Sequence, residues 1–164
     1  METKELGIAV VGSGRIGSLR AKMAALHPGV RFLAVSDLEP DKAKKLAETT
    51  GADLSSGNNE EIIAHDEVNA VIVSTSEHEH VAPIMQALEL GKPVLVEKPI
   101  ALTLEDADRI IAKSEDTGTP LHVGYAQRFK RRYLSAKDQI EEGRLGDVLA
   151  FNARACNTRA QGVE

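Results

Sequence analysis

A glycine-rich turn between an apolar run and a helical pattern constrains the fold of this chain more than any other feature. Gly12, Gly14 and Gly17 form the sequence GSGRIG directly after the apolar run 6–11. Apolar residues then recur at helical spacing over 16–26. We therefore expect a buried strand that turns tightly into a helix, which is the opening unit of an alternating β/α chain.

Apolar runs and helical patterns continue to alternate along the chain. The expected strands are 6–11, 32–36, a short run after Gly51, 70–73, 94–96 and 121–124. The expected helices are 16–26, 43–47 ending at Gly51, 60–64, 81–88 ending at Gly91, and 104–114. In the helix over 16–26 the apolar residues at helical spacing are Ile16, Leu19, Met23 and Leu26. In the helix over 104–114 the residues expected to face inward are Ala107, Ile110 and Ile111. This order predicts an α/β domain with a doubly wound parallel sheet over residues 1–125.

The remaining segment, 126–164, is expected to hold a linker helix and one further strand. Apolar residues recur at helical spacing from Phe129 to Ile140, and Gly143 follows them. Residues 148–155 then alternate apolar and polar side chains, which is typical of a strand with one buried face. Because no partner strand follows, we expect at most the first strand of a second α/β domain, in a truncated chain or a homo-oligomer that completes the sheet.

The composition excludes several other classes of protein. The chain has 164 residues, 42% of them apolar, and no apolar run approaches the roughly 20 residues that span a bilayer, so no membrane partner is expected. A net charge of −5 argues against a nucleic-acid partner. The single cysteine, Cys156, and an N-terminus without an export signal predict a cytoplasmic location.

The glycine motif also carries the first functional prediction. A GxGxxG sequence alone is a weak signal, but this one follows an expected strand, opens an expected helix and precedes Asp37 by twenty positions counted from Gly17. Gly12 permits the turn, Gly14 leaves room for a pyrophosphate, and Gly17 lets the helix pack closely on the strand. Together these features predict a dinucleotide-binding Rossmann domain.

The same region predicts NAD as the cofactor, in preference to NADP. The backbone N–H groups of Arg15 and Ile16 lie at the start of a helix, where an anion is favoured. Asp37 can accept hydrogen bonds from both hydroxyls of the adenosine ribose, and its carboxylate repels a 2′-phosphate. The alternatives are a glycine turn with a helix-capping aspartate, and an Arg15 side chain that is merely solvated.

Polar residues follow the fourth expected strand at the carboxyl edge, where doubly wound sheets bind ligands. They are Ser74, Thr75 and the segment 76–80, which contains His78 and His80. Residues two apart do not share a helical face and no third ligand stands out, so no metal site is expected. The alternative is that this segment only caps the next helix and holds both histidines in its first turn.

The fifth expected strand ends in Glu97, Lys98 and Pro99 at the same edge. A lysine at that place would lie beside a bound nicotinamide and could act as acid or base on a substrate hydroxyl. The local sequence by itself favours a plain surface pair between Glu97 and Lys98 over this role.

Taken together, these motifs resemble the Gfo/Idh/MocA oxidoreductases, a family named for glucose-fructose oxidoreductase and inositol dehydrogenase. The resemblance covers essentially the whole chain. It rests on GSGRIG at 12–17, VSD at 35–37, VSTSEHEH at 73–80, GKPVLVEKPIA at 91–101 and VGYAQRF at 123–129. Of these, EKP is the most specific.

The resemblance implies a Rossmann domain followed by an α/β domain with an open, mostly antiparallel sheet. It implies that Lys98 is the active-site lysine, that Glu97 is its neighbour at the cofactor, and that His80 closes the motif after the fourth strand. Thr75 would line the nicotinamide side, and Arg128 would correspond to the arginine of a similar Arg-Phe pair in the family. An Asp and His pair that works with the lysine belongs to the family's second domain.

We therefore expect an NAD-dependent dehydrogenase or reductase that acts on a small-molecule sugar, inositol or related polyol. Lys98 would assist proton transfer while hydride moves between the substrate carbon and the nicotinamide. Two alternatives stay open. One is a catalytically silent NAD-binding module, and the other is a relative that uses NAD transiently to hydrolyse a glycosidic bond.

Overall fold

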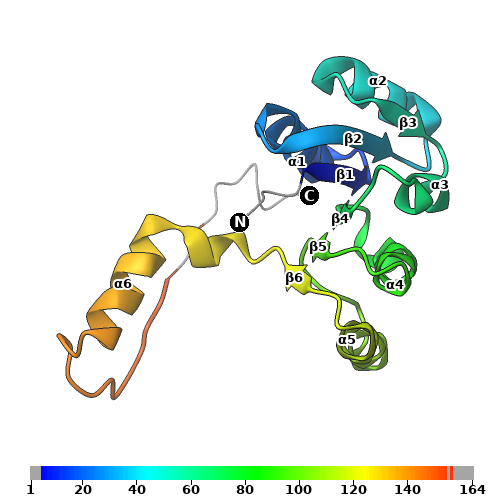
Figure 1. Ribbon diagram of the computed structural model, residues 1–164. Helices are drawn as coiled ribbons and strands as arrows, with labels where there is room; N and C mark the ends of the chain where they lie inside the picture. The colour runs from blue at the N-terminus through cyan, green and yellow to red at the C-terminus, as the bar shows by residue number, and fades with distance from the viewer. Residues whose placement is uncertain (1–4, 155, 157–164) are drawn as a thin grey trace. The chain divides into compact units, whose positions relative to one another are not determined.

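A computed structural model describes residues 5–154 and 156, and it divides the chain into two compact units after Gly124. The strands of the first unit are β1 (Leu6–Val11), β2 (Val30–Ser36), β3 (Leu54–Ser56), β4 (Ala70–Val73), β5 (Val94–Val96) and β6 (Leu121–Val123). Its α-helices are α1 (Arg15–Leu26), α2 (Pro40–Thr50), α3 (Asn59–Ala64), α4 (Val81–Glu89) and α5 (Leu104–Thr117). A short 3₁₀ helix, η1 (Glu77–Glu79), precedes α4 (Figure 1).

The six strands form one parallel sheet in the order β3-β2-β1-β4-β5-β6. From β1 the chain winds outward to β2 and β3, and from β4 it winds in the opposite direction to β5 and β6. This arrangement confirms the predicted doubly wound α/β fold. It also creates a topological switch point between β1 and β4, and ligands of such folds bind at the carboxyl ends of the strands there.

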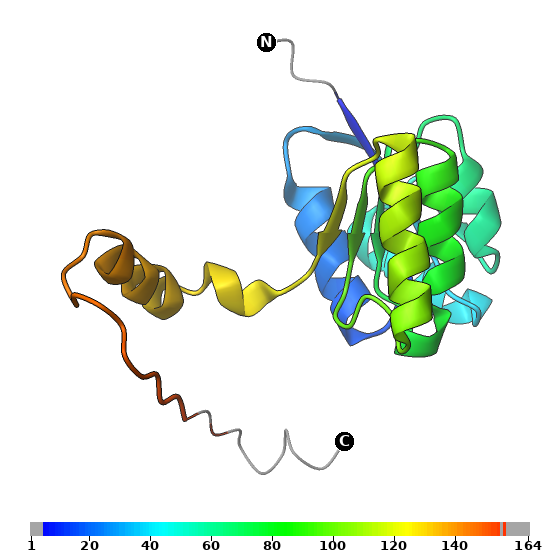
Figure 2. The same ribbon diagram turned by 90° about the horizontal axis from the view of Figure 1, so that it is seen from below.

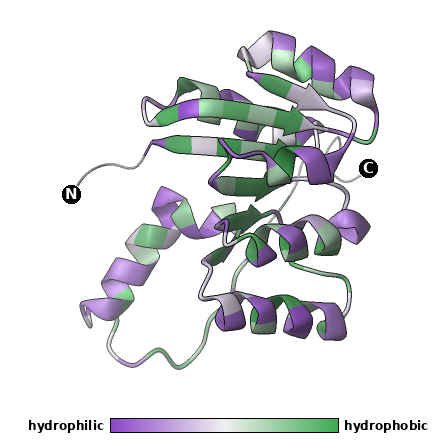
Figure 3. Cartoon of the chain, turned by 45° about the vertical axis from the view of Figure 1, so that its right-hand side comes forward, coloured by the Kyte–Doolittle hydropathy of each residue, from purple (hydrophilic) through white to green (hydrophobic). Residues whose placement is uncertain are grey.

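Two apolar cores hold the helices against opposite faces of the sheet. One core packs α3, α4 and α5 against the sheet through buried residues such as Ile62, Ile84 and Ile110. The other packs α1 and α2 through Ala21 and Leu46. Figure 2 shows α1 on one side of the strands and α4 and α5 on the other. In Figure 3 the strands are mostly hydrophobic, whereas the helices carry a hydrophilic outer face, as amphipathic surface helices do.

The apolar stripe that recurs at helical spacing along α1 is not the buried face of this helix. Leu19 and Met23 are 52% and 57% exposed, and Ile16 and Leu26 are exposed too. The buried residues of this helix are Gly17, Ala21 and Ala24. Both sets recur at helical spacing, so periodicity alone does not choose between them. The small residues face the sheet because they allow the helix axis to lie close to the strands.

The prediction for α5 is wrong at one residue. Ile110 is fully buried, but Ile111 is 45% exposed. This helix begins at an N-cap, where the Thr103 hydroxyl accepts a hydrogen bond from Asp106 N, and it extends to a left-handed Gly118. The expected C-cap of α2 at Gly51 is confirmed by its φ of 69°.

The second unit contains a 3₁₀ helix, η2 (Ala126–Phe129), and the helix α6 (Arg131–Glu141). The strand expected over 148–155 is not formed: residues 148–154 carry no strand assignment, and Ala155 lies outside the described residues. The physical reason is that a strand needs hydrogen bonds to a neighbouring strand, and alternation alone does not supply one. Within residues 5–154, no helix has both the length and the apolar character needed to cross a membrane.

Candidate functional site

A cavity of about 730 Å³ lies at the carboxyl edge of the sheet, at the switch point between β1 and β4. It is lined by these residues that the sequence had singled out: Gly12, Gly14, Arg15, Ile16, Asp37, Ser74, Thr75, His80, Glu97 and Lys98. Gly17 does not line the cavity but is buried beneath the turn. Arg128 belongs to the second unit, on η2, and its place at a cofactor stays a prediction.

The three glycines differ in what their missing side chain permits. Gly12 has a φ of 96°, and a Cβ on it would lie 2.6 Å from the Ser74 carbonyl oxygen. A Cβ on Gly17 would lie 1.8 Å from the Gly12 carbonyl oxygen, so only glycine lets α1 pack this closely on the turn. Around Gly14 no chain atom lies within 4 Å of a Cβ position. The space beside Gly14 therefore belongs to the cavity.

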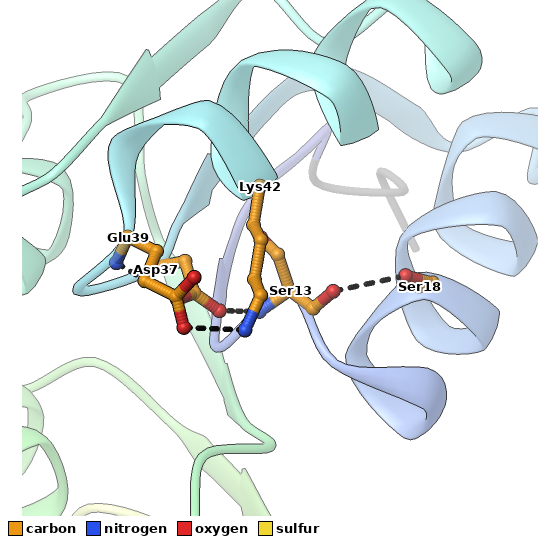
Figure 4. A network of polar contacts seen from close by, with 5 residues as sticks. All are labelled: Ser13, Ser18, Asp37, Glu39 and Lys42. Atoms are coloured by element: carbon orange, nitrogen blue, oxygen red, sulfur yellow. Dashed lines mark hydrogen bonds and ion pairs between the residues drawn. The ribbon is translucent and has the colours of Figure 1, made fainter.

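Asp37 follows β2 and is bound to the glycine turn. Its Oδ2 accepts a 2.8 Å hydrogen bond from Ser13 N, and its Oδ1 accepts a 3.0 Å bond from Glu39 N. Figure 4 shows these contacts together with Lys42, whose Nζ lies 2.5 Å from Glu39 Oε1. The hydrogen bond and charge of Glu39 raise the pKa of Lys42, and Asp37 adds a smaller contribution. The Asp37 carboxylate thus lies at the end of β2, one strand away from β1 and the turn that leads into α1.

The backbone hydrogen bonds between neighbouring strands continue into the polar residues of the site. Ser74 N donates to Val11 O at 2.8 Å, and Glu97 N donates to Val73 O at 2.9 Å. The residues after β4 and β5 are therefore held in line at one edge of the sheet, although they are far apart in sequence.

His80 is buried and is anchored to the turn after β5. Its Nδ1 lies 2.8 Å from the Pro99 carbonyl oxygen. Because a carbonyl only accepts, Nδ1 carries the hydrogen of this bond. Within the described chain, His80 Nε2, Ser74 Oγ and Thr75 Oγ1 are buried without a hydrogen-bond partner. Unpaired buried polar atoms are costly, and three of them at one cavity are typical of a place where a ligand or water completes the bonding.

Lys98 and Glu97 take different partners. Glu97 forms an ion pair with Arg20 of α1, with 2.5 Å between Nη2 and Oε1. Lys98 is exposed at the cavity, and no acidic side chain of residues 5–154 pairs with it. The alternative of a plain surface pair between Glu97 and Lys98 is therefore wrong, because Arg20 holds the carboxylate.

The segment after β4 differs from its expected form. Ser76 is the N-cap of η1, without a side-chain hydrogen bond, and α4 begins only at Val81, after His80. His78 is largely exposed, whereas His80 is 1% exposed. The two histidines thus do not share the first turn of α4. Among the described residues, no three His, Cys, Asp or Glu side chains form a group that could hold a metal ion.

Several residues of the site had no marker in the sequence. Ser13 and Arg20 are reached through their contacts with Asp37 and Glu97. Leu38, Lys42 and Asn59 line the cavity beside Asp37. Ser13, Arg20 and Asn59 hydrogen-bond to residues that follow or belong to other elements, and Lys42 pairs with Glu39 at the N-cap of its own helix. A one-dimensional pattern does not report such pairs. Only Leu38, directly after Asp37, had a position in the sequence that could have marked it.

The fold, the glycine turn and the aspartate after β2 together define an α/β protein of the dinucleotide-binding class. The NAD-binding Rossmann-fold part of the Gfo/Idh/MocA oxidoreductase family matches residues 6–125. The chain belongs to this family, as its motifs predicted.

Named relatives in the family include inositol dehydrogenases. The chain is 33% identical to the scyllo-inositol 2-dehydrogenase (NAD(+)) of Bacillus subtilis (strain 168), over 94% of this chain and 45% of that protein. It is 30% identical to the myo-inositol 2-dehydrogenase of Thermotoga maritima, over 90% of this chain and 45% of that protein. The chain therefore spans less than half the length of these curated relatives.

A solved structure of similar fold contains the cofactor. The scyllo-inositol dehydrogenase of Lactobacillus casei with bound NAD(H) and scyllo-inositol superposes with a TM-score of 0.82 at 25% identity, over 88% of this chain and 43% of that one. The coenzyme in that structure belongs to the cofactor class that the sequence predicted.

Proposed function

We propose that this chain is the NAD-binding half of an oxidoreductase that moves hydride between a nicotinamide and a polyol, an inositol or a related sugar. The observation that carries the proposal is the bond from Ser13 N to Asp37 Oδ2. It holds the Asp37 carboxylate next to the start of α1, so the carboxylate would accept the hydroxyls of the adenosine ribose where the helix start would bind the pyrophosphate.

The cavity residues divide naturally along the length of such a cofactor. The pyrophosphate would lie on the N–H groups of Arg15 and Ile16, in the space left beside Gly14. The adenosine ribose would lie on Asp37. The nicotinamide end would reach toward Lys98, past the buried polar atoms of Ser74, Thr75 and His80.

Preference for NAD over NADP follows from charge. The Asp37 carboxylate faces the place of the ribose hydroxyls, where it would repel a 2′-phosphate. Lys42 does not reverse this sign, because its ammonium is paired with Glu39.

NAD, when bound, supplies the hydride acceptor, and the protein supplies the base. Lys98 is exposed and lines the cavity, so its amine could take a proton from a substrate hydroxyl while the neighbouring carbon is oxidised. In the reverse direction the same ammonium would return the proton. The segment 97–99 is anchored on both sides of the lysine, by Arg20 and by His80.

The test combines binding and turnover. Calorimetry should show that NADH binds more tightly than NADPH. In a full-length form that carries the family's second domain, a panel of inositols and other polyols should reveal NAD-dependent turnover that Lys98→Ala reduces by at least about a hundredfold. Undiminished turnover in Lys98→Ala would remove this lysine from the mechanism. Absence of heat with either coenzyme would overturn the proposal as a whole.

A second candidate is a catalytically silent dinucleotide-binding module. This candidate predicts tight NADH binding with no turnover on any polyol. Analysis of the products distinguishes both candidates from a glycosidase, which would hydrolyse a glycosidic bond and return NAD unchanged.

A further inference from the structure

We propose that Arg20 is a positioning residue for Lys98, and that it acts through Glu97. This inference rests on the proposed function, because it assigns Lys98 to the nicotinamide end of the cavity. It concerns an arginine that no sequence motif considered above includes.

Arg20 reaches from the pyrophosphate-binding helix to the end of β5. Its Nε and Nη2 both donate to Glu97 Oε1, at 2.9 Å and 2.5 Å. The two side chains are only 22% and 17% exposed, so solvent screens this pair less than an ordinary surface ion pair. Charge-assisted bonds of this kind are among the stronger hydrogen bonds in proteins.

The Glu97 carboxylate is confined from the other side by the end of β6. A Cβ on Gly124 would lie 3.2 Å from Glu97 Oε2, so a larger residue there would crowd the carboxylate. Glu97 N is bound to Val73 O. The backbone and the side chain of Glu97 are therefore both held in place. Because Lys98 is the next residue, the position of its backbone is fixed as well.

A second anchor holds the far side of the lysine. His80 Nδ1 donates to the Pro99 carbonyl oxygen at 2.8 Å. Lys98 thus lies between two tethered residues, although its own side chain is exposed. The two anchors come from different elements, the histidine from the start of α4 and the arginine from α1.

The origin of Arg20 decides what the anchor does. Arg20 lies one turn after Gly17, on the same rigid helix whose first turn offers N–H groups to the pyrophosphate. The same helix would therefore fix both the position of the pyrophosphate and the position of the turn that carries Lys98. Loss of the arginine should disturb the nicotinamide end of the site and leave the pyrophosphate and adenosine end unchanged.

The experiment compares two ligands that differ only at the nicotinamide end. NADH and ADP-ribose are titrated by calorimetry against the wild-type chain, Arg20→Met, Arg20→Lys and the control Lys22→Met. Lys22 lies on the same helix, is exposed and makes no side-chain hydrogen bond or ion pair among the described residues, so its loss removes a charge without removing the anchor.

We expect Arg20→Met to weaken NADH by about tenfold and ADP-ribose by less than about twofold, since one charge-assisted bond to a positioned group is worth about that factor. Arg20→Lys should recover part of the NADH affinity, and Lys22→Met should match wild type for both ligands. If Arg20→Met does not fold, Glu97→Gln replaces it in the same comparison.

Two outcomes overturn the inference. Equal weakening of NADH and ADP-ribose in Arg20→Met would show a general disturbance of α1, and unchanged binding of both would show that the ion pair positions nothing. Neither outcome touches the proposed function, which fails only if wild type binds neither ligand.

Discussion

The backbone N–H of Ser13, inside the glycine turn, donates a 2.8 Å hydrogen bond to Asp37 Oδ2. This contact joins the turn after β1 to the residue that follows β2. Glu39 N holds the other carboxylate oxygen at 3.0 Å. The carboxylate is therefore oriented by the chain itself. Each of its oxygens keeps a further lone pair, which is what two ribose hydroxyls would require.

The first prediction concerns cofactor preference. Asp37→Ala should weaken NADH by about tenfold or more and leave NADPH unchanged or improved, because it removes the ribose acceptor and the charge that repels a 2′-phosphate. Asp37→Asn is the matched variant, since its amide oxygen can still accept from Ser13 N while the charge is gone. Calorimetric titration with both coenzymes checks this, and equal wild-type affinity for the two would contradict the assignment.

The second prediction separates two glycines of the motif. Gly17→Ala should destabilise the fold by about 2–4 kcal/mol or more, because its Cβ would lie 1.8 Å from the Gly12 carbonyl oxygen and α1 would have to move. Gly14→Ala should leave the melting temperature nearly unchanged and weaken NADH, because its Cβ enters open space that the ligand would occupy. Urea unfolding and calorimetry measure the two effects. A Gly17→Ala chain as stable as wild type would contradict the packing argument.

The third prediction concerns the anchor at Pro99. His80→Ala should destabilise the chain by about 2–4 kcal/mol, because it leaves a cavity and removes the donor to the Pro99 carbonyl. The exposed His78 provides the control, and His78→Ala should change stability by less than about 0.5 kcal/mol. Chemical denaturation of both variants is the measurement. Similar losses in the two would indicate that the Pro99 bond contributes nothing.

The fourth prediction concerns a lysine outside the cavity. Lys92 Nζ donates to Ile63 O at 2.6 Å and to His65 O at 2.9 Å, at the C-terminal end of α3. Lys92→Met should therefore cost about 1–2 kcal/mol, because these helix-end carbonyls lose a charged donor. Urea unfolding near neutral pH measures this loss.

The same lysine predicts a pH dependence. Burial lowers the pKa of Lys92 below its ordinary value of 10.5, and Asp66 opposes the shift. Between the folded value and 10.5 the unfolded chain binds more protons, so this group's contribution to stability rises with pH in that window. The loss in Lys92→Met should accordingly be larger just below pH 10.5 than at neutral pH. A difference that shrinks as pH rises would contradict the sign.

The sequence by itself determined the order of strands and helices, the glycine turn and the position of Asp37. Strands 70–73 and 94–96 are confirmed at both ends, because a buried parallel strand is a short apolar run bounded by polar residues or proline, and both properties are local. The turn at Gly12 was equally local, since its φ of 96° is one that favours glycine.

Only the tertiary structure decided which residues meet and which face of a helix is buried. Arg20 and Glu97 are 77 positions apart, and their ion pair depends on the crossing of α1 over the sheet. Leu19 and Met23 are exposed because Ala21 and Ala24 let α1 approach the strands more closely. A strand over 148–154 is missing because strand formation requires a neighbour, and hydropathy along one segment carries no information about that neighbour.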